Sequence, residues 1–273
     1  MPPSSGTKAF VLALLLAAFM AFAALALELA RAEVDQHGNL IVALGGEIEP
    51  RLLPREGAAP AALTLSGYLK TADGAPLPHL RSIEFALASR GGIDSRGLPV
   101  CPLRLLRGAR PETALSSCGD ALVGHGQLEI SVFLPNQPPF DFDATLRAFN
   151  GRRHDERLLW LHIYGAHPPS SFVLPVTRHK SHGLFPTSMR IAIPAAVGPW
   201  PHVAKFEFTL ERRFSVKGDQ RSFLNASCPL PPRFTAGLFP FARATYQLAD
   251  GASIRTTIVR GCRSKPERRA GGR

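Results

Sequence analysis

The chain has 273 residues, of which 45% are hydrophobic and 19% are charged, and its 32 Lys and Arg exceed its 21 Asp and Glu to give a formal net charge of +11. This amount of apolar material excludes a disordered acidic chain, and the lack of a short sequence period excludes a collagen-like or coiled-coil rod. The sequence therefore predicts a basic protein with enough apolar residues to form a core.

Residues 1–32 have the pattern of a signal peptide. Lys8 and the amino terminus supply positive charge, Ala9–Leu27 is uncharged and rich in Ala, Leu and Phe, and Ala30-Arg31-Ala32 is a small-x-small cleavage signal. The alternative is an uncleaved membrane anchor, because residues 9–27 just reach the roughly 20 apolar residues that span a bilayer. Under either reading we expect the body of the protein to be exported, to the extracellular space or the cell envelope.

The body has the residue alternation of β-strands. An alternating strand buries one face of a sheet and exposes the other to solvent. The clearest alternating runs are Ile83–Leu87, Leu128–Val132, Phe206–Leu210 and Ile254–Ile258. Leu158–Ile163 is more continuously apolar and contains Trp160, which predicts a central strand covered on both faces.

Turn signals separate these runs. Asp73-Gly74, between Leu63–Lys70 and Leu80–Ala88, predicts a hairpin, and so does Asp250-Gly251, between Ala242–Leu248 and Ser253–Arg260. Asn150-Gly151 begins a looser predicted turn between Thr145–Phe149 and Arg157–Tyr164. Longer loops are predicted at the proline clusters 135–139, 168–169 and 229–232. One short helix is expected around Pro111–Cys118, because Pro111 suits the first helical turn and Gly119 suits the end of a helix.

These elements predict an all-β fold, a two-sheet antiparallel sandwich that is Ig-like or larger, with about ten to twelve strands and at most one short helix. We expect one domain over residues 33–263; the alternative is two halves that separate near residues 150–156. Residues 264–273 form a basic tail that is predicted to be disordered.

The four cysteines, Cys101, Cys118, Cys228 and Cys262, all follow the predicted signal peptide, and their even number suits a disulfide framework. Three pairings are possible. The pairs Cys101–Cys118 and Cys228–Cys262 are favoured because each closes a local loop. A zinc site is disfavoured, since there is no Cys-x-x-Cys and no His at ligand spacing from Cys101 or Cys118.

Most of the cationic residues are arginines, and they are scattered along the chain rather than gathered in one block. Arginine binds carboxylate and phosphate groups with a two-pronged fork, so the predicted partner is an anionic polymer of the envelope or another envelope protein. No nucleic-acid partner is expected, because none of the usual motifs is present. Contact with a membrane is expected only if residues 9–27 remain as an anchor.

Five histidines fall in one stretch, at positions 154, 162, 167, 179 and 182. By alternation His162 shares a strand face with Trp160 and is expected to be a packing residue. His179 and His182 lie in a polar segment, where Arg178 and Lys180 oppose the binding of a metal cation. No metal site and no cofactor are predicted.

Hydrolytic chemistry has only weak candidates. Asp141 and Asp143 would share one face of a strand, with Phe140 and Phe142 on the other, and we expect them to be solvated rather than a glycosidase pair. Gly-x-Ser-x-Gly is absent, so Ser222, Ser227 and Asp250 are interpreted as ordinary strand or turn residues. No catalytic residue is assigned. Trp200, between two prolines in a predicted loop, is the candidate ligand contact.

A set of short segments resembles a group of uncharacterised exported proteins of high-G+C actinobacteria, over roughly residues 38 to 263. The segments are Pro50–Arg55, Gly97–Cys101, Cys118–Gly126, Phe149–Gly151, Arg212–Phe214, Ser227–Pro229 and Arg260–Cys262. The resemblance implies export and a bacterial envelope setting, and it supplies no catalytic residue.

Together these observations predict an exported, non-enzymatic β-sandwich protein of the cell envelope or extracellular space, with a binding or scaffolding role. The alternative is an exported hydrolase whose site is assembled in space from Asp141, Asp143 and the histidines from His154 to His182.

Overall fold

The computed structural model divides the chain after Ala32 into two units, and the fold described below is that of the second unit, Glu33–Arg273. The structure describes residues 32–88, 91–154, 156–194, 200–231 and 234–264. Except for Ala32 and Ser264, the predicted signal peptide (1–32), its apolar run (9–27) and the predicted basic tail (264–273) lie outside these ranges. Within them, no helix is long and apolar enough to cross a membrane.

Thirteen strands form one sheet, in which every neighbouring pair is antiparallel except β18 and β3. In spatial order the strands are β1 (Glu33–His37), β2 (Leu40–Glu49), β5 (Ala62–Thr71), β13 (Pro201–Leu210), β8 (Leu122–Val132), β9 (Phe140–Arg153), β10 (Glu156–Ala166), β11 (Pro169–Lys180), β12 (Thr187–Ala192), β6 (Leu80–Leu87), β17 (Ala236–Leu248), β18 (Ser253–Ser264) and β3 (Leu52–Leu53).

Five shorter strands form two small sheets. These strands are β4 (Ala59–Pro60), β16 (Leu224–Ala226) and β7 (Gly91–Ile93) in one sheet, and β14 (Arg213–Val216) and β15 (Asp219–Ser222) in the other. Strands of two to four residues carry too little alternation to be recognised in the sequence, which is why about ten to twelve strands were expected.

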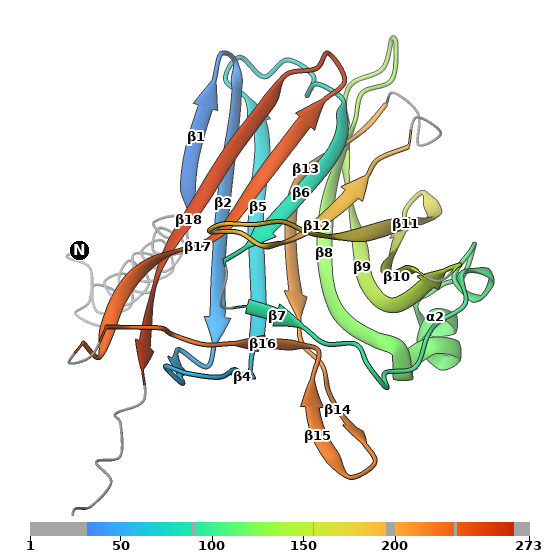
Figure 1. Ribbon diagram of the computed structural model, residues 1–273. Coiled ribbons are helices and arrows are strands. Elements are labelled where there is room, and N and C mark those ends of the chain that lie inside the picture. Colours follow the sequence, from blue (N-terminus) through green and yellow to red (C-terminus); the bar gives the residue numbers. More distant parts are fainter. Residues whose placement is uncertain (1–31, 89–90, 155, 195–199, 232–233, 265–273) are drawn as a thin grey trace, which may run out of the picture. The chain divides into compact units, whose positions relative to one another are not determined.

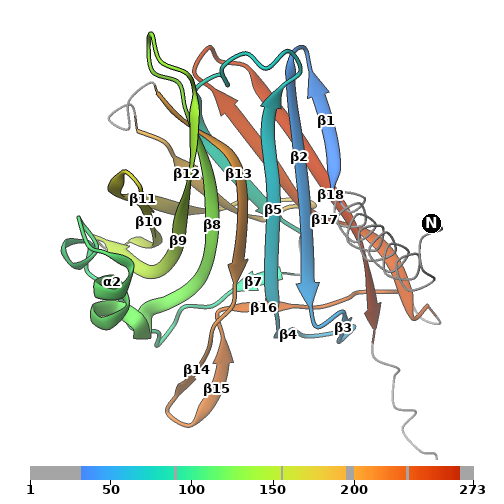
Figure 2. The ribbon, with the colours of Figure 1, turned by 180° about the vertical axis from the view of Figure 1, so that it is seen from behind.

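The large sheet curls back on itself, so that β6 and β17 lie opposite β5 and β13 (Figures 1 and 2). Across the interior, the rings of Phe85 on β6 and Phe206 on β13 meet edge to face with centroids 5.8 Å apart. The curl also brings β18 against β1 and β2, where the Arg260 guanidinium lies 2.6 Å from the Glu33 carboxylate and 2.8 Å from the Gly46 carbonyl oxygen. Side chains therefore join the two ends of the sheet.

The prediction of an all-β fold is confirmed, but the predicted pair of separate Ig-like sheets is not what the structure shows. One continuous sheet provides both layers, because the long strands β8, β9 and β10 pair in sequence and carry the hydrogen-bonded ladder around the bend. At the position of the alternative domain split, residues 150–153 of β9 pair with residues 156–159 of β10 within this sheet.

Strand β10 is covered on both faces, as expected. Leu159 and Leu161 point into the main core, whereas Leu158 and Trp160 belong to a second buried cluster beneath helix α2 (Pro111–Cys118). The predicted helix is confirmed, with Pro111 in its first turn, and it is the α-helix of the described residues. Two short 3-10 helices, η1 (Leu103–Leu105) and η2 (Gly119–Ala121), flank it.

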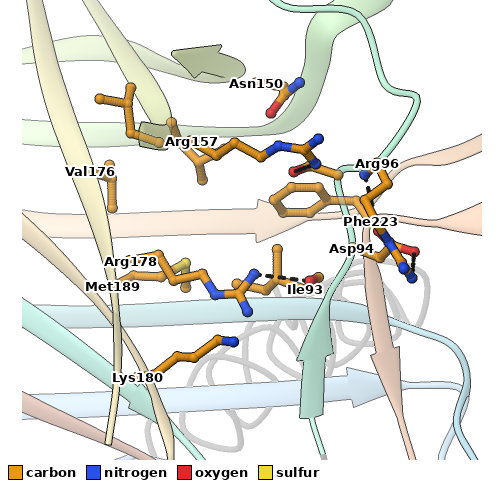
Figure 3. Close-up of a pocket in the computed structure, with 13 residues that line it drawn as sticks. Ile93, Asp94, Arg96, Asn150, Arg157, Val176, Arg178, Lys180, Met189 and Phe223 are labelled. Carbon is orange, nitrogen blue, oxygen red and sulfur yellow. Dashed lines mark hydrogen bonds and ion pairs between the residues drawn. The ribbon is translucent and has the colours of Figure 1, made fainter. Parts of the chain in front are cut away.

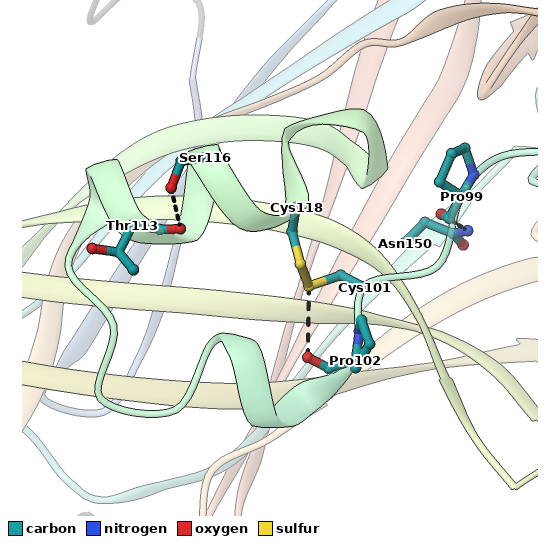
Figure 4. Close-up of a disulfide and its surroundings, with 7 residues drawn as sticks. All are labelled: Pro99, Cys101, Pro102, Thr113, Ser116, Cys118 and Asn150. Atoms are coloured by element: carbon teal, nitrogen blue, oxygen red, sulfur yellow. Dashed lines mark hydrogen bonds between the residues drawn. A yellow bond between two sulfur atoms is a disulfide. The ribbon is translucent and has the colours of Figure 1, made fainter.

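Both predicted disulfides are formed. Cys101 bonds Cys118, with 5.5 Å between their Cα atoms, and Cys228 bonds Cys262, with 5.9 Å. The first joins the end of α2 to the segment before η1 (Figure 4). Disulfides persist in oxidising compartments, so this pairing agrees with an extracellular setting.

One predicted hairpin is confirmed and another is wrong. Asp250-Gly251 turns β17 into β18, and the two strands pair from Gln247 with Ser253 onwards. Asp73-Gly74 does form a turn, but β5 and β6 do not pair; they lie in opposite layers of the curled sheet. The Asp73 carboxylate instead accepts a hydrogen bond from the Asn39 amide, which ties this crossing to the β1–β2 turn.

The predicted connection between runs 145–149 and 157–164 is formed, as the β9–β10 hairpin, but it does not begin at Asn150-Gly151: both residues lie inside β9, and the chain turns later, near His154, which has a φ of 52°. The Asn150 amide nitrogen donates to the carbonyl oxygens of Leu98 and Pro99. A Cβ on Gly151 would lie 2.4 Å from the Trp160 ring. The pair of residues is thus used for close packing rather than for turning.

Candidate functional site

A pocket of about 360 Å³ lies between the segment that follows β7 and the strands β10, β11 and β12 (Figure 3). Its floor is apolar, formed by Leu159, Val176, Met189 and Phe223, and its wall is polar. The polar residues that line it are Asp94, Ser95, Arg96, Asn150, Arg157, Arg178 and Lys180. Its volume falls in the lower part of the range of roughly 300–1,000 Å³ that is usual for small-molecule sites.

Strand alternation explains why cations face this pocket. On β11, Val176 is buried in the core, and Arg178 and Lys180 follow it at intervals of two on the same face. On β10, Arg157 precedes the buried Leu159 in the same way. The inward-facing rows of both strands therefore continue beyond the apolar core as positively charged side chains.

Arg157 and Arg178 are placed opposite one another by the strand register. Leu158 pairs with Thr177 across β10 and β11, so the next position along the ladder sets the two arginines side by side. Like charges directly opposite on neighbouring strands destabilise a sheet. An anion between the two guanidinium groups would remove that repulsion.

The carboxylate in the pocket is already neutralised. Arg96 donates to both carboxylate oxygens of Asp94, at 2.9 Å to Oδ1 and 3.0 Å to Oδ2, and the Arg221 guanidinium lies 3.6 Å from Oδ2. The Arg96 hydrogen bond, against the opposing effect of burial, holds the pKa of Asp94 below its usual range. Asp94 is therefore an anion that other arginines hold.

The remaining cations have weaker partners. Arg178 donates to the Ile93 carbonyl oxygen at 3.1 Å, and Arg157 donates to the Ser95 hydroxyl at 3.4 Å. Within the part of the chain that the structure describes, no carboxylate forms an ion pair with Arg157, Arg178 or Lys180. These three residues give the pocket a net positive charge above an apolar floor, which suits a ligand with an anionic group and a carbon skeleton.

The sequence did not identify Arg157, Arg178 and Lys180 as a site, because the arginines are scattered along the chain and no motif marks these three. The sequence predicted for Arg178 and Lys180 only that their charges oppose the binding of a metal cation. The signal that could have located them is the continuation of two inward-facing apolar rows, on β10 and β11, into charged residues.

Asp141 and Asp143 are exposed side by side on one face of β9, and neither lines the basic pocket. Phe140 and Phe142 point to the opposite face, as predicted, and line a different cavity. Asp143 pairs across the sheet with Glu129 of β8. The face is therefore an exposed acidic surface of the sheet.

His162 is the buried member of the predicted histidine stretch, and His154, His167, His179 and His182 are exposed. Its Nε2 lies 2.9 Å from the Ala109 carbonyl oxygen and 3.5 Å from the Ser171 hydroxyl. Burial, with a smaller contribution from the Arg147 charge, lowers the pKa of His162.

This geometry does not make His162 a base for Ser171. A carbonyl oxygen only accepts, so the neutral imidazole must carry its proton on Nε2 and donate it to Ala109. Nε2 then has no lone pair for the proton of the Ser171 hydroxyl, which itself donates to Ala109 at 3.4 Å. Nδ1 is buried with no hydrogen-bond partner among the described residues. Nor do any three His, Cys, Asp or Glu side chains of the described ranges gather as metal ligands.

Ser222, Ser227 and Asp250, interpreted from the sequence as ordinary strand or turn residues, lie in strands, turns or beside a disulfide. Ser222 donates from its hydroxyl to the Arg212 carbonyl oxygen at 3.3 Å. Asp250 accepts from the Ala252 backbone NH at 2.9 Å in the β17–β18 turn. Ser227 adjoins Cys228 of the second disulfide.

Trp200, the predicted ligand contact, is 41% exposed and lies at the rim of a larger apolar cavity of about 810 Å³. That cavity shares no lining residue with the basic pocket. Comparisons with protein-family models, with curated proteins and with solved structures give no match for this chain. The functional argument therefore rests on the geometry of the site.

Proposed function

We propose that this chain is an exported, non-enzymatic binding protein of the cell envelope or extracellular space, and that its basic pocket holds an anionic group of an envelope polymer. The observation that carries the proposal is the placement of Arg157 beside Arg178 on neighbouring strands, with Lys180 next along the same row. The two disulfides and the sequence of residues 1–32 support the extracellular setting.

The chemistry of the pocket favours a carboxylate or phosphate ester borne on a sugar or polyol. Two guanidinium groups supply forked donors to anionic oxygens, and Leu159, Val176 and Met189 form a surface against which carbon atoms pack. A polymer that repeats such a group would engage one unit in the pocket, and its other charges would interact with the basic surface at longer range. Binding of this kind weakens as salt screens the charges.

The experiment is co-sedimentation of the protein with purified cell envelopes, at about 50 mM and about 500 mM salt, where the Debye length falls from roughly 14 to 4 Å. The double variant Arg157→Ala/Arg178→Ala should lose binding at low salt by roughly tenfold or more, since each charge-assisted bond contributes on the order of 1.5–3 kcal/mol.

The matched control is Arg104→Ala/Arg107→Ala, which removes the same charge from exposed positions in and next to η1. This control should bind at least half as well as the native protein. Equal loss in both double variants would show that net charge, rather than the pocket, attaches the protein to envelopes, and would overturn the assignment. Envelope binding that ignores salt would also contradict it.

A further inference from the structure

The larger cavity, of about 810 Å³, is lined by residues from both layers of the curled sheet. Its lining includes residues at the end of the sheet where β8 joins β9 and where β13 begins, an end of the strands that Figure 1 shows. Leu128 and Ile130 of β8 form part of one wall, and Phe172 and Leu174 of β11 form part of the other. The polar side chains along its lining are His79, Arg81, Ser170 and His202. The rest of the lining is aliphatic, aromatic or proline.

A second cavity, of about 90 Å³ and lined by apolar residues alone, adjoins this one on the side of the core. The two cavities share the lining residues Leu128, Ile163, Leu174, Ile193 and Val203. Protein interiors pack about as densely as organic crystals, with few voids larger than a water molecule. The inner cavity offers water no hydrogen bonds, and the lining of the larger cavity is mostly apolar, so the two together suit a guest with an apolar chain.

The rim carries exposed aromatic rings. Trp200 is 41% exposed and Phe140 is 40% exposed. Val132 pairs with both Phe140 and Pro201, so the register of three adjacent strands brings these rings to the same end of the sheet. Large apolar side chains that are exposed next to one another mark a surface to which another molecule binds.

A positive charge lies beside these rings. Arg81 is exposed near the start of β6 and lines the same cavity. Nearby, the imidazoles of His79 and His202 stack with centroids 4.9 Å apart, and Phe133 meets His202 edge to face at 5.4 Å. The cavity therefore has an apolar depth, an aromatic rim and a cationic side chain at its mouth.

We propose that this cavity binds a free long-chain fatty acid, with the alkyl chain between the two layers of the sheet and the carboxylate beside Arg81. Charge complementarity at Arg81 selects an anionic head over a neutral one, and the small adjoining apolar cavity selects a linear chain. This site is separate from the basic pocket and does not depend on the function proposed for it.

The test is a calorimetric titration of the full protein with saturated carboxylates of increasing length, below their micelle concentrations, together with tryptophan fluorescence. The affinity should increase roughly fourfold for each added methylene until the cavity is filled. Trp160 is buried under α2, so the fluorescence change should disappear in Trp200→Phe while the calorimetric signal remains. An affinity independent of chain length would overturn the proposal.

Variants separate the chain from the head. Arg81→Gln should weaken carboxylate binding about tenfold and leave the alcohol of the same chain length unchanged, whereas the control Arg104→Gln should change neither. Val203→Trp should fill the inner cavity, which Val203 also lines, and end the gain in affinity at a shorter chain length; if it fails to fold, Trp200→Ala at the exposed rim should still weaken binding several-fold. Arg157→Ala/Arg178→Ala should bind the fatty acid normally.

Two outcomes would contradict the assignment. One is an equal loss of affinity for the carboxylate and for the alcohol in Arg81→Gln. The other is binding to phospholipid vesicles without binding to free fatty acid.

Discussion

Asn150 connects the basic pocket to the loop that carries the first disulfide. Its side-chain amide nitrogen donates to the Pro99 carbonyl oxygen at 2.7 Å and to the Leu98 carbonyl oxygen at 3.2 Å. Its backbone carbonyl oxygen accepts from the Cys101 backbone NH at 2.9 Å. These bonds provide hydrogen-bond partners for a segment without regular secondary structure, whose carbonyl oxygens would otherwise lack these donors. One side chain thus fixes the path of the chain between β7 and η1.

Replacing Asn150 with Ala should lower the free energy of unfolding by about 1–3 kcal/mol, because two carbonyl oxygens lose their donor in a buried site. Chemical denaturation measures the change. Asn150→Asp is the sharper comparison, since a carboxylate would face the same two oxygens without a proton to donate, and its loss should exceed that of Ala. An Ala variant as stable as the native protein would show that water replaces the amide.

His162 should make stability depend on pH. Burial holds its folded-state pKa below the ordinary value of about 6.5, so the unfolded chain binds the proton more readily than the folded one. Stability is therefore complete above about pH 6.5 and falls as the pH decreases towards the folded-state pKa, by at most about 1.4 kcal/mol per pH unit from this group.

Comparison with His162→Gln isolates this contribution, since the Gln amide can still donate to the Ala109 carbonyl oxygen but does not titrate. The difference in unfolding free energy between the two proteins should change between pH 7 and pH 5. A constant difference over that range would mean that His162 titrates alike in both states.

Strands β10 and β11 show how a binding site can be produced by extending a core strand. Their inward rows pack the interior through Leu159 and Val176, then present Arg157 and Arg178 where the interior ends. The side-by-side arginines repel one another, so function and stability should respond in opposite directions at these positions.

Arg178→Thr should stabilise the protein without ligand by about 0.2–1 kcal/mol, because it removes a like-charge pair and places a β-branched residue in a strand. Thermal unfolding at low salt measures the gain, and high salt should reduce it by screening. Arg190, on the neighbouring strand β12, provides a control substitution outside the pocket. A destabilised Arg178→Thr would show that the bond to the Ile93 carbonyl outweighs the repulsion.

The disulfides act at the scale of the elements that they join. Their loops span 17 and 34 residues, for which chain entropy gives about 3 kcal/mol for Cys101–Cys118 and about 4 kcal/mol for Cys228–Cys262. Replacing both cysteines of a pair with alanine should therefore lower the free energy of unfolding, and the loss should be larger for the Cys228–Cys262 pair than for the Cys101–Cys118 pair. Denaturation of the two variants, each retaining the other disulfide, provides the comparison, and the reverse order would mean that packing around α2 outweighs loop entropy.

The whole sheet depends on a join between its two ends. Glu33 accepts hydrogen bonds from the Val259 backbone NH at 3.1 Å and from Arg260 at 2.6 Å, and Thr256 donates to the Asp35 carboxylate. A Cβ on Gly46 would lie 2.9 Å from the Ile258 side chain, so β2 and β18 approach closely here. Among the described strands, β1 pairs with β2 at the end of the sheet, and its residues also contact β18.

Glu33→Ala should loosen this join. Removal of the carboxylate leaves Arg260 and the Val259 NH without that acceptor, and the expected loss is about 1 kcal/mol, because the pair is partly exposed and solvent screens it. Hydrogen exchange should quicken in β1 and β18 and remain unchanged in β9 and β10. Uniform acceleration over the whole sheet would indicate that the join is required for global stability rather than for closing one edge.

Local patterns in the sequence were sufficient for several features. Period-two alternation identified the long strands, and the proline and glycine that flank residues 111–118 located the helix. Loop length favoured the disulfide pairing that the structure has. Alternation also placed His162 beside Trp160 in a buried face. Each of these features depends on contacts between residues that are close in the chain, so local chemistry determines it.

Other features depend on strands that are distant in the chain. Asp73-Gly74 carries a hairpin signal, but the strands on either side pair with β2, β13, β12 and β17 instead, because the curl of the sheet assigns them to opposite layers. Asn150-Gly151 carries a turn signal that a buried amide and the Trp160 ring override. Arg157 and Arg178 are brought together by the consecutive strands β10 and β11, but residues 93–96 and Phe223, which complete the basic pocket, come from distant parts of the chain. The cavity beneath Trp200 arises only when the sheet folds back on itself. The alternation of the strands was determined by the sequence alone, whereas the two cavities were decided by the tertiary structure, because each is completed by segments that no local pattern brings together.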